Sequence, residues 1–158
     1  KRCITESTSG GQNIYQPDLC DVITNDNKTF LVQLKDDAGN WSDGAPVSVN
    51  DIVFTYEGVM QKNIWDLPQY KNNANVVVQK SSADTLTVTF PQASKENMMF
   101  FTDFILPSHI LKSWSREDYT KKMPTEFVTN GCATLSNSRD EKSLIFDLKN
   151  CPNTRIRY

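Results

Sequence analysis

The stretch WSDGAPVSVNDIVFTYEGVM, residues 41–60, contains a tight turn, a helix cap and an amphipathic helix, in that order. Asp43 and Gly44 supply the turn, because glycine adopts positive φ without steric cost, and Pro46 stiffens the extended segment that follows. Trp41 is expected to close this turn beneath the helix. The stretch carries structural signals and no recognisable catalytic group.

The helix is predicted to begin at about Val49. Ser48 is placed to cap it, and Asp51 lies in the first turn, where a carboxylate meets the positive end of the helix dipole. The apolar residues recur at the i, i+3, i+4, i+7 spacing of a helix with one buried stripe. They are Val49, Ile52, Val53, Tyr56, Val59 and Met60.

Three segments have the residue patterns of strands. In residues 30–35, Phe30, Val32 and Leu34 alternate with Leu31, Gln33 and Lys35. Residues 75–79 and 84–90 flank a polar turn and predict a hairpin.

Further elements follow from capping and breaking residues. The sequence predicts a helix over 94–104 with Met98, Phe101 and Ile105 inward, a helical turn over 108–112, a capped helix over 115–122, and a hairpin with arms near 132–136 and 144–148. Residues 7–18 are predicted to form a surface loop, because Ser, Thr, Gly and Asn predominate there. The combination predicts an α+β domain with a small, mostly antiparallel sheet and packed helices.

The chain resembles the family 5 extracellular solute-binding proteins, the dipeptide and oligopeptide receptors of bacterial ABC importers. The similarity rests first on the order Leu-Lys, short loop, Trp-Ser-Asp-Gly-x-Pro-Val-x-x-x-Asp-Ile-Val-Phe-Thr-Tyr, and then on four further segments in matching order. These are Asp84–Phe90, Ile105–Lys112, Phe127–Gly131 and Lys149–Asn153. The chain departs from the family at Cys132-Ala133-Thr134, where the family has Pro or Ala and then an aromatic residue.

The resemblance implies a particular part of a larger protein. Full receptors of the family have several hundred residues in three lobes, whereas 158 residues fit one core and one domain. Residues 1–158 are therefore expected to form a single domain, the accessory lobe (domain II) of a receptor of the type II periplasmic-binding-protein kind. The larger lobes would lie outside this chain.

Four cysteines, Cys3, Cys20, Cys132 and Cys151, allow three pairings. The predicted hairpin between Cys132 and Cys151 would bring its open ends to bridging distance, which favours a Cys132–Cys151 and a Cys3–Cys20 disulfide. A zinc site is an alternative, but zinc ligands usually come in close pairs and no two cysteines here are that near. Free buried thiols remain a further alternative in a reducing compartment.

The charge balance argues against nucleic acid as a partner. Seventeen basic and nineteen acidic residues give a net charge of −2, without the basic excess that binds phosphate backbones. No apolar run is long enough to span a bilayer. We expect no cofactor and no metal.

Two residues merit comparison as candidate functional groups. His109 is the only histidine, and without a neighbouring nucleophile it is interpreted as a surface or capping residue. Trp65 lies in the loop after the capped helix, where family members can direct an aromatic ring toward the ligand, so it is the candidate ligand-binding residue. The alternative is that Trp65 and Tyr70 only fix this loop to the core. No catalytic residue is predicted.

The resemblance implies part of an extracytoplasmic receptor that captures peptides or similar small solutes, in which this lobe is structural. Its partners would be the remaining lobes, the ABC permease, and a solute bound mainly by the other lobes. The location would be the periplasm or the exterior of a bacterial cell. The alternative is a secreted protein-interaction or adhesion module built on the same lobe, which the extra cysteines would suit.

Overall fold

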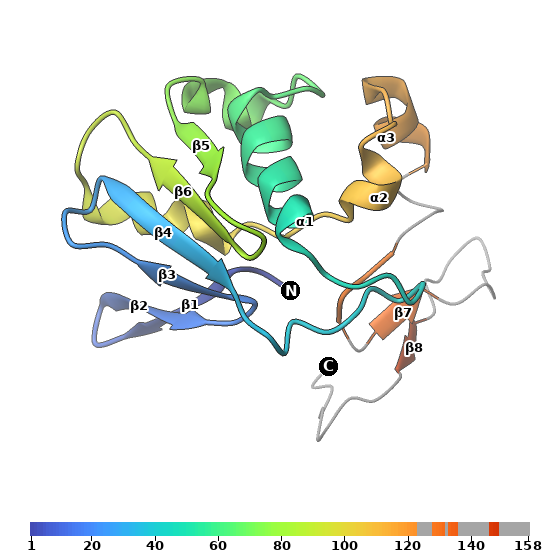
Figure 1. Cartoon of the computed structure of the whole chain (residues 1–158), viewed down its shortest axis with the longest axis horizontal. Helices are drawn as coiled ribbons and strands as arrows, with labels where there is room; N and C mark the ends of the chain where they lie inside the picture. Colours follow the sequence, from blue (N-terminus) through green and yellow to red (C-terminus); the bar gives the residue numbers. More distant parts are fainter. Residues whose placement is uncertain (123–127, 132, 136–145, 149–158) are drawn as a thin grey trace.

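The computed structural model describes residues 1–122, 128–131, 133–135 and 146–148. Within these ranges the chain forms antiparallel sheets and short helices (Figure 1). The strands are β1 (Ile4–Ser9), β2 (Gln12–Pro17), β3 (Cys20–Ile23), β4 (Thr29–Leu34), β5 (Val77–Lys80), β6 (Thr85–Thr89), β7 (Ala133–Leu135) and β8 (Phe146–Leu148). The helical segments are α1 (Val49–Val53), η1 (Phe54–Gln61), η2 (Pro68–Asn73), η3 (Lys95–Thr102), α2 (Ser108–Leu111) and α3 (Arg116–Lys122).

The central sheet has the strand order β3-β4-β6-β5. In it Val32 of β4 lies opposite Val22 on one side and Leu86 on the other. Val32 and Leu86 are fully buried on the inner face, whereas Leu31 is 40% exposed on the outer face. The alternation read from residues 30–35 is thus confirmed, as is the α+β class with antiparallel sheets.

The helix that covers the inner face begins at Val49, as predicted, and Ser48 and Asp51 form a capping box. From Phe54 onward it continues as a π-helix, which the sequence did not predict. At this junction the Thr55 hydroxyl donates to the Asp51 carbonyl at 2.8 Å, a side-chain bond to the i−4 carbonyl of the kind that perturbs helices. The buried stripe keeps its predicted direction, since Ile52 is fully buried against the sheet.

Residues 7–18 correct the sequence reading, because they lie in a β-hairpin rather than in a loop. β1 and β2 pair from Ile4 opposite Pro17 to Ser9 opposite Gln12. Gly10 and Gly11, with φ of 58° and 76°, make the tight turn that joins the two strands. Most of this hairpin is exposed on both faces, so it has no apolar alternation by which a strand could be recognised.

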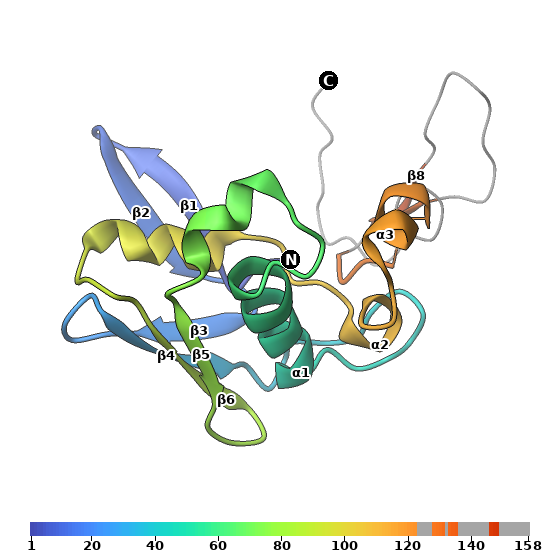
Figure 2. The same cartoon turned by 90° about the horizontal axis from the view of Figure 1, so that it is seen from above.

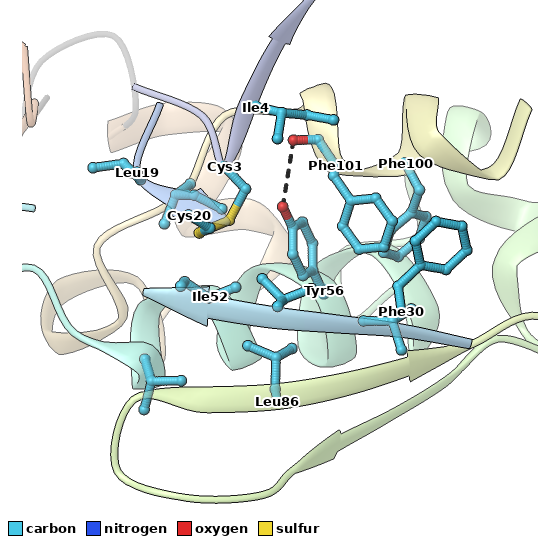
Figure 3. Close-up of a cluster of buried hydrophobic side chains, with 14 of the residues drawn as sticks. Cys3, Ile4, Leu19, Cys20, Phe30, Ile52, Tyr56, Leu86, Phe100 and Phe101 are labelled. Carbon is cyan, nitrogen blue, oxygen red and sulfur yellow. Dashed lines mark hydrogen bonds between the residues drawn. A yellow bond between two sulfur atoms is a disulfide. The ribbon is translucent and has the colours of Figure 1, made fainter. Parts of the chain in front are cut away.

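Helix η3 lies between the β1–β2 hairpin and the central sheet (Figure 2). Ser94 caps it, and Phe101 and Ile105 are buried as predicted, while Met98 is half-buried. Phe101 packs against Phe30 with ring centroids 5.1 Å apart. Figure 3 shows this cluster, with the hydroxyl of Tyr56 directed at the carbonyl oxygen of Phe101, 3.5 Å away.

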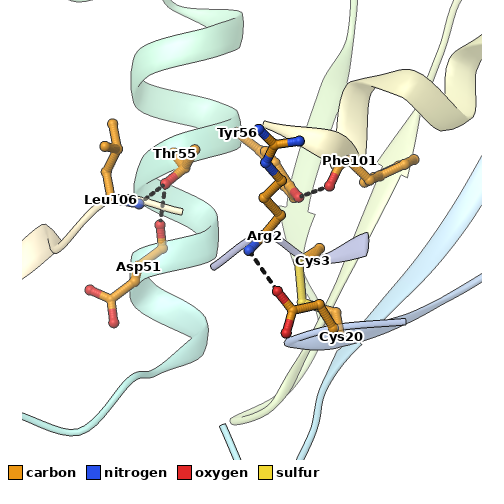
Figure 4. Close-up of a disulfide and its surroundings, with 9 residues drawn as sticks. Arg2, Cys3, Cys20, Asp51, Thr55, Tyr56, Phe101 and Leu106 are labelled. Carbon is orange, nitrogen blue, oxygen red and sulfur yellow. Dashed lines mark hydrogen bonds between the residues drawn. A yellow bond between two sulfur atoms is a disulfide. The ribbon is translucent and has the colours of Figure 1, made fainter. Parts of the chain in front are cut away.

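A disulfide joins Cys3 and Cys20, with Cα atoms 4.5 Å apart, as predicted (Figure 4). Both residues are fully buried, so the bridge ties the start of the β1–β2 hairpin to β3 inside the core. The 17-residue separation corresponds to a loop-closure contribution of about 3 kcal/mol. Cys132 and Cys151, predicted as the second pair, lie outside the described residues.

The remaining predicted elements are found in the described part of the chain. α2 and α3 match the helices expected over 108–112 and 115–122, and β7 pairs with β8 from Ala133 opposite Leu148. Among the helices that the structure describes, none has the length and apolar character needed to cross a membrane.

Replacing Ile52 with Asp is expected to unfold the domain. Ile52 is fully buried beneath the sheet, and an unpaired carboxylate there would cost at least about 4 kcal/mol. Chemical denaturation followed by circular dichroism measures the loss. The matched control is Asn50→Asp, which places the same charge on an exposed position of the same helix and should unfold like the wild type. A normal transition for Ile52→Asp would contradict the packing of α1 on the sheet.

Candidate functional site

A cavity of about 340 Å³ lies beside η1, between the loop after this helix, the segment 103–107 and residues 128–131. Its lining is mainly aromatic and aliphatic. The lining includes Trp65, Tyr70, Asp103, Leu106, Tyr119 and Asn130. These residues come from four separate parts of the sequence, and the fold brings them together.

Trp65 is the sequence-predicted site residue, and it lines this cavity. Its side chain is only 1% exposed, and its indole Nε1–H donates to the Trp114 carbonyl at 3.1 Å. The ring stacks on Tyr119 at 4.4 Å with an interplanar angle of 22°, and meets Phe54 edge-on at 5.9 Å. Trp65 therefore fixes its loop to a second, smaller core and also forms part of the cavity wall.

Tyr70 and Asp103 form a polar pair on the wall of the cavity. The Tyr70 hydroxyl donates to a carboxylate oxygen of Asp103 at 3.2 Å. Burial, followed by the negative charge of Asp103, disfavours the phenolate and raises the pKa of Tyr70 to about 12. Tyr70 therefore remains a neutral hydrogen-bond donor at physiological pH.

Asn130 is the functional candidate that sequence reasoning missed. Its side chain is 8% exposed, and its Oδ1 accepts a hydrogen bond from the amino group of Lys1. Its Nδ2 is the one buried side-chain nitrogen or oxygen without a partner in the described part of the chain. The sequence showed only a turn before a glycine here, because an unpaired amide depends on contacts with residues far along the chain.

Hydrogen bonds to Asp51 in α1 and to Thr55 in η1 hold segment 103–107, which forms one wall of the cavity. The Leu106 backbone N–H donates to the Thr55 hydroxyl at 3.0 Å (Figure 4). Two residues on, the Ser108 backbone N–H and hydroxyl donate to the Asp51 carboxylate at 2.8 and 2.6 Å. These bonds fix segment 103–107 against the helix, so the cavity wall is part of the folded core.

His109 lies outside the cavity and pairs with Asp43, with Nε2 and a carboxylate oxygen 2.8 Å apart. Partial burial raises the pKa of Asp43, but the bonds from His109 and from the Ala45 backbone N–H outweigh it, and the pKa is lowered overall. The pair links α2 to the turn at Gly44. This placement agrees with the surface role predicted for His109.

The N-terminus of α3 positions Tyr119 beneath Trp65. The backbone N–H and hydroxyl of Ser115 donate to the Asp118 carboxylate at 3.0 and 2.8 Å, as the sequence predicted for a capping pair. These bonds, with the nearby Lys122 ammonium, lower the pKa of Asp118 to about 2. The cap therefore fixes the helix on which the stacked ring is carried.

The cavity provides aromatic surface and hydrogen-bond donors. Among its described lining residues there is no serine, cysteine or histidine that could act as a nucleophile or general base beside a partner. The arrangement is typical of a binding surface.

A family model for the middle region of the bacterial extracellular solute-binding proteins, family 5, matches residues 15–147. The chain belongs to this family. It is a family of solute-binding proteins and not of enzymes. The resemblance inferred from the Trp41–Met60 stretch is confirmed.

A curated relative comes from Deinococcus radiodurans and is described as "Probable ABC transporter-binding protein". It is 28% identical over 102 residues, which cover 59% of this chain and 16% of the relative.

Two solved structures share the fold. NikZ from Campylobacter jejuni, in complex with Ni(L-His), superposes with a TM-score of 0.77 at 17% identity over 94% of this chain and 29% of its own. The oligopeptide-binding protein AppA from Bacillus subtilis, in complex with a nonapeptide, gives a TM-score of 0.73 at 15% identity over 95% of this chain and 30% of its own. The chain thus spans less than a third of the length of either protein.

The pKa of the Asp118 carboxyl group, which caps α3, should lie well below that of an ordinary aspartate. Because the folded pKa of Asp118 is depressed, the cap stabilises the fold above about pH 4 and loses this contribution as the pH falls toward 2. NMR titration of the Asp118 carboxyl carbon should give a midpoint of about 2. Ser115→Ala removes the hydroxyl donor and should raise this midpoint. Thr120→Ala, which removes a hydroxyl bonded to the Arg116 carbonyl, should leave it unchanged; a wild-type midpoint near 3.8 would disprove the capping arrangement.

Proposed function

We propose that residues 1–158 form the accessory lobe of a solute receptor that serves an ABC importer outside the cytoplasm of a bacterium. The observation that carries this proposal is the family match over residues 15–147, joined to a fold that covers less than a third of two similar receptors. The lobe would be a single domain, and its partners would be the remaining lobes and, through the whole receptor, the membrane permease.

The solute would be a peptide or a similarly small molecule. Support comes from the ligands named for similar structures, a nonapeptide in one and Ni(L-His) in the other. The other lobes would enclose most of this solute. In such receptors the open and closed states differ in solute affinity, and binding shifts the equilibrium toward closure.

The role of this lobe would be to provide a rigid wall. The Cys3–Cys20 disulfide, the Asp51 hydrogen bonds and the aromatic contacts of Trp65 all favour a body that moves as one unit. Trp65 is also proposed to contact the solute, through the part of its surface that lines the cavity. The location would be the periplasm or the cell surface.

Isothermal calorimetry tests the division of labour between the lobes. The chain alone, titrated with trialanine and with a nonapeptide at micromolar concentrations, is expected to give no binding heat, because most of the solute contacts would lie on the other lobes. Micromolar affinity for either peptide would contradict an accessory role.

The coding sequence that flanks this segment tests the receptor assignment directly. A secretion signal upstream and several hundred codons of the larger lobes downstream are the expected finding. A cell-wall anchor or tandem copies of the same module would instead identify an adhesion protein.

A further inference from the structure

We infer that the cavity beside Trp65 is a side pocket for one apolar group of a peptide-like solute, and that Asn130 recognises a carbonyl oxygen next to that group. The inference rests on the proposed function, since it assigns one part of solute binding to this lobe. The proposed Trp65 contact specifies no polar group, whereas here Asn130 is the donor and a carbonyl oxygen of the solute is the acceptor.

The size and walls of the cavity fit a single apolar group. Its volume of about 340 Å³ falls near the lower end of the range, about 300–1,000 Å³, that is usual for small-molecule sites. The Trp65 and Tyr119 rings are already stacked on each other, so the aromatic wall is formed before any ligand arrives. Aliphatic side chains of Val59, Ile105 and Leu111 belong to the same lining.

The unpaired amide of Asn130 indicates what the ligand must offer. The bond from the Lys1 amino group engages Oδ1 and so defines which end of the amide is the free donor, Nδ2. A buried N–H group without a partner is unfavourable, and an acceptor on a bound molecule would satisfy it. The other buried polar groups of the wall already have partners: the Trp65 indole bonds Trp114, and the Thr55 hydroxyl bonds Asp51.

The wall contains two charged groups, the Lys1 amino group that bonds Asn130 and the Asp103 carboxylate. The Asp103 carboxylate lines the same cavity and is held by the Tyr70 hydroxyl. A ligand carboxylate beside it would be repelled, whereas an amide carbonyl would not. An apolar amino-acid residue within a peptide chain has both required parts, a side chain for the aromatic wall and a backbone carbonyl for Asn130.

The test uses N-acetyl-L-phenylalaninamide as the probe, with the indole N–H of Trp65 and the side-chain amide of Asn130 as NMR reporters. Saturable shifts of both signals are expected, with a dissociation constant on the order of 1 mM for a ligand of this size. Toluene, which lacks the acceptor, should shift the Trp65 signal alone and bind more weakly. Equal affinity for both probes, or no saturation by the first, would overturn the inference.

Asn130→Asp isolates the donor, because it keeps an oxygen for the Lys1 nitrogen and replaces Nδ2 with a second oxygen. Affinity for N-acetyl-L-phenylalaninamide should fall at least about tenfold, the scale of one lost hydrogen bond, while affinity for toluene stays within twofold of the wild type, roughly the range of a neutral change. Asn72→Asp adds the same charge outside the cavity and should leave both affinities unchanged. Undiminished binding of the amide probe by Asn130→Asp would contradict the role of Asn130.

The two proposals fail separately. Specific probe binding in a chain whose flanking codons encode adhesion modules would uphold the pocket and reject the receptor assignment. Receptor lobes in the flanking codons, with no probe binding, would reject the pocket alone.

Discussion

The carboxylate of Asp51 joins the turn at Trp41 and the start of α1 to Ser108, which lies 57 residues further along the chain. One oxygen accepts from the Ser108 backbone N–H and hydroxyl, and the other accepts from the Trp41 indole and from the backbone N–H and hydroxyl of Ser48. Asp51 is only 2% exposed, and a buried carboxylate is tolerated only when hydrogen bonds replace its hydration. The same side chain therefore caps α1, fixes the turn before it and anchors the start of α2.

This anchor determines where the helix and the cavity wall lie relative to the sheet. Ile52 follows Asp51 directly and is buried in the same core cluster as Val32 of β4 and Leu86 of β6, so the cap and the core contact are set by adjacent residues. One turn later Thr55 receives the backbone N–H of Leu106 and thereby holds the cavity wall. The aromatic floor beneath Trp65 then rests on a scaffold whose geometry is already fixed.

The elements recognisable in the sequence were those with one buried face. The alternation in residues 30–35 and the stripe that includes Ile52 both arise because one side of each element meets the core, and both predictions are confirmed. The β1–β2 hairpin was missed because it is exposed on both sides and has no such pattern. The π-helix was missed because the side-chain bond from Thr55 to the Asp51 carbonyl, which accompanies it, leaves no mark in the hydrophobic pattern.

The candidate site was only partly predictable. Trp65 stood out by its residue type and its place after the helix, but its stacking on Tyr119 and its bond to Trp114 depend on tertiary packing. Asn130 gave no signal, since an amide is unpaired only in relation to everything around it. Sequence patterns report burial along one element, whereas a pocket is formed between several.

The Asp51→Ala variant tests the role of the Asp51 hydrogen bonds most directly, through its free energy of unfolding in denaturant. The loss should be about 3 kcal/mol or more, because the buried Trp41 indole and the half-buried Ser108 donors would lose their acceptor, whereas Glu117→Ala, at an exposed ion pair with Lys121, should cost less than about 1 kcal/mol. Equal small losses in the two variants would contradict the account.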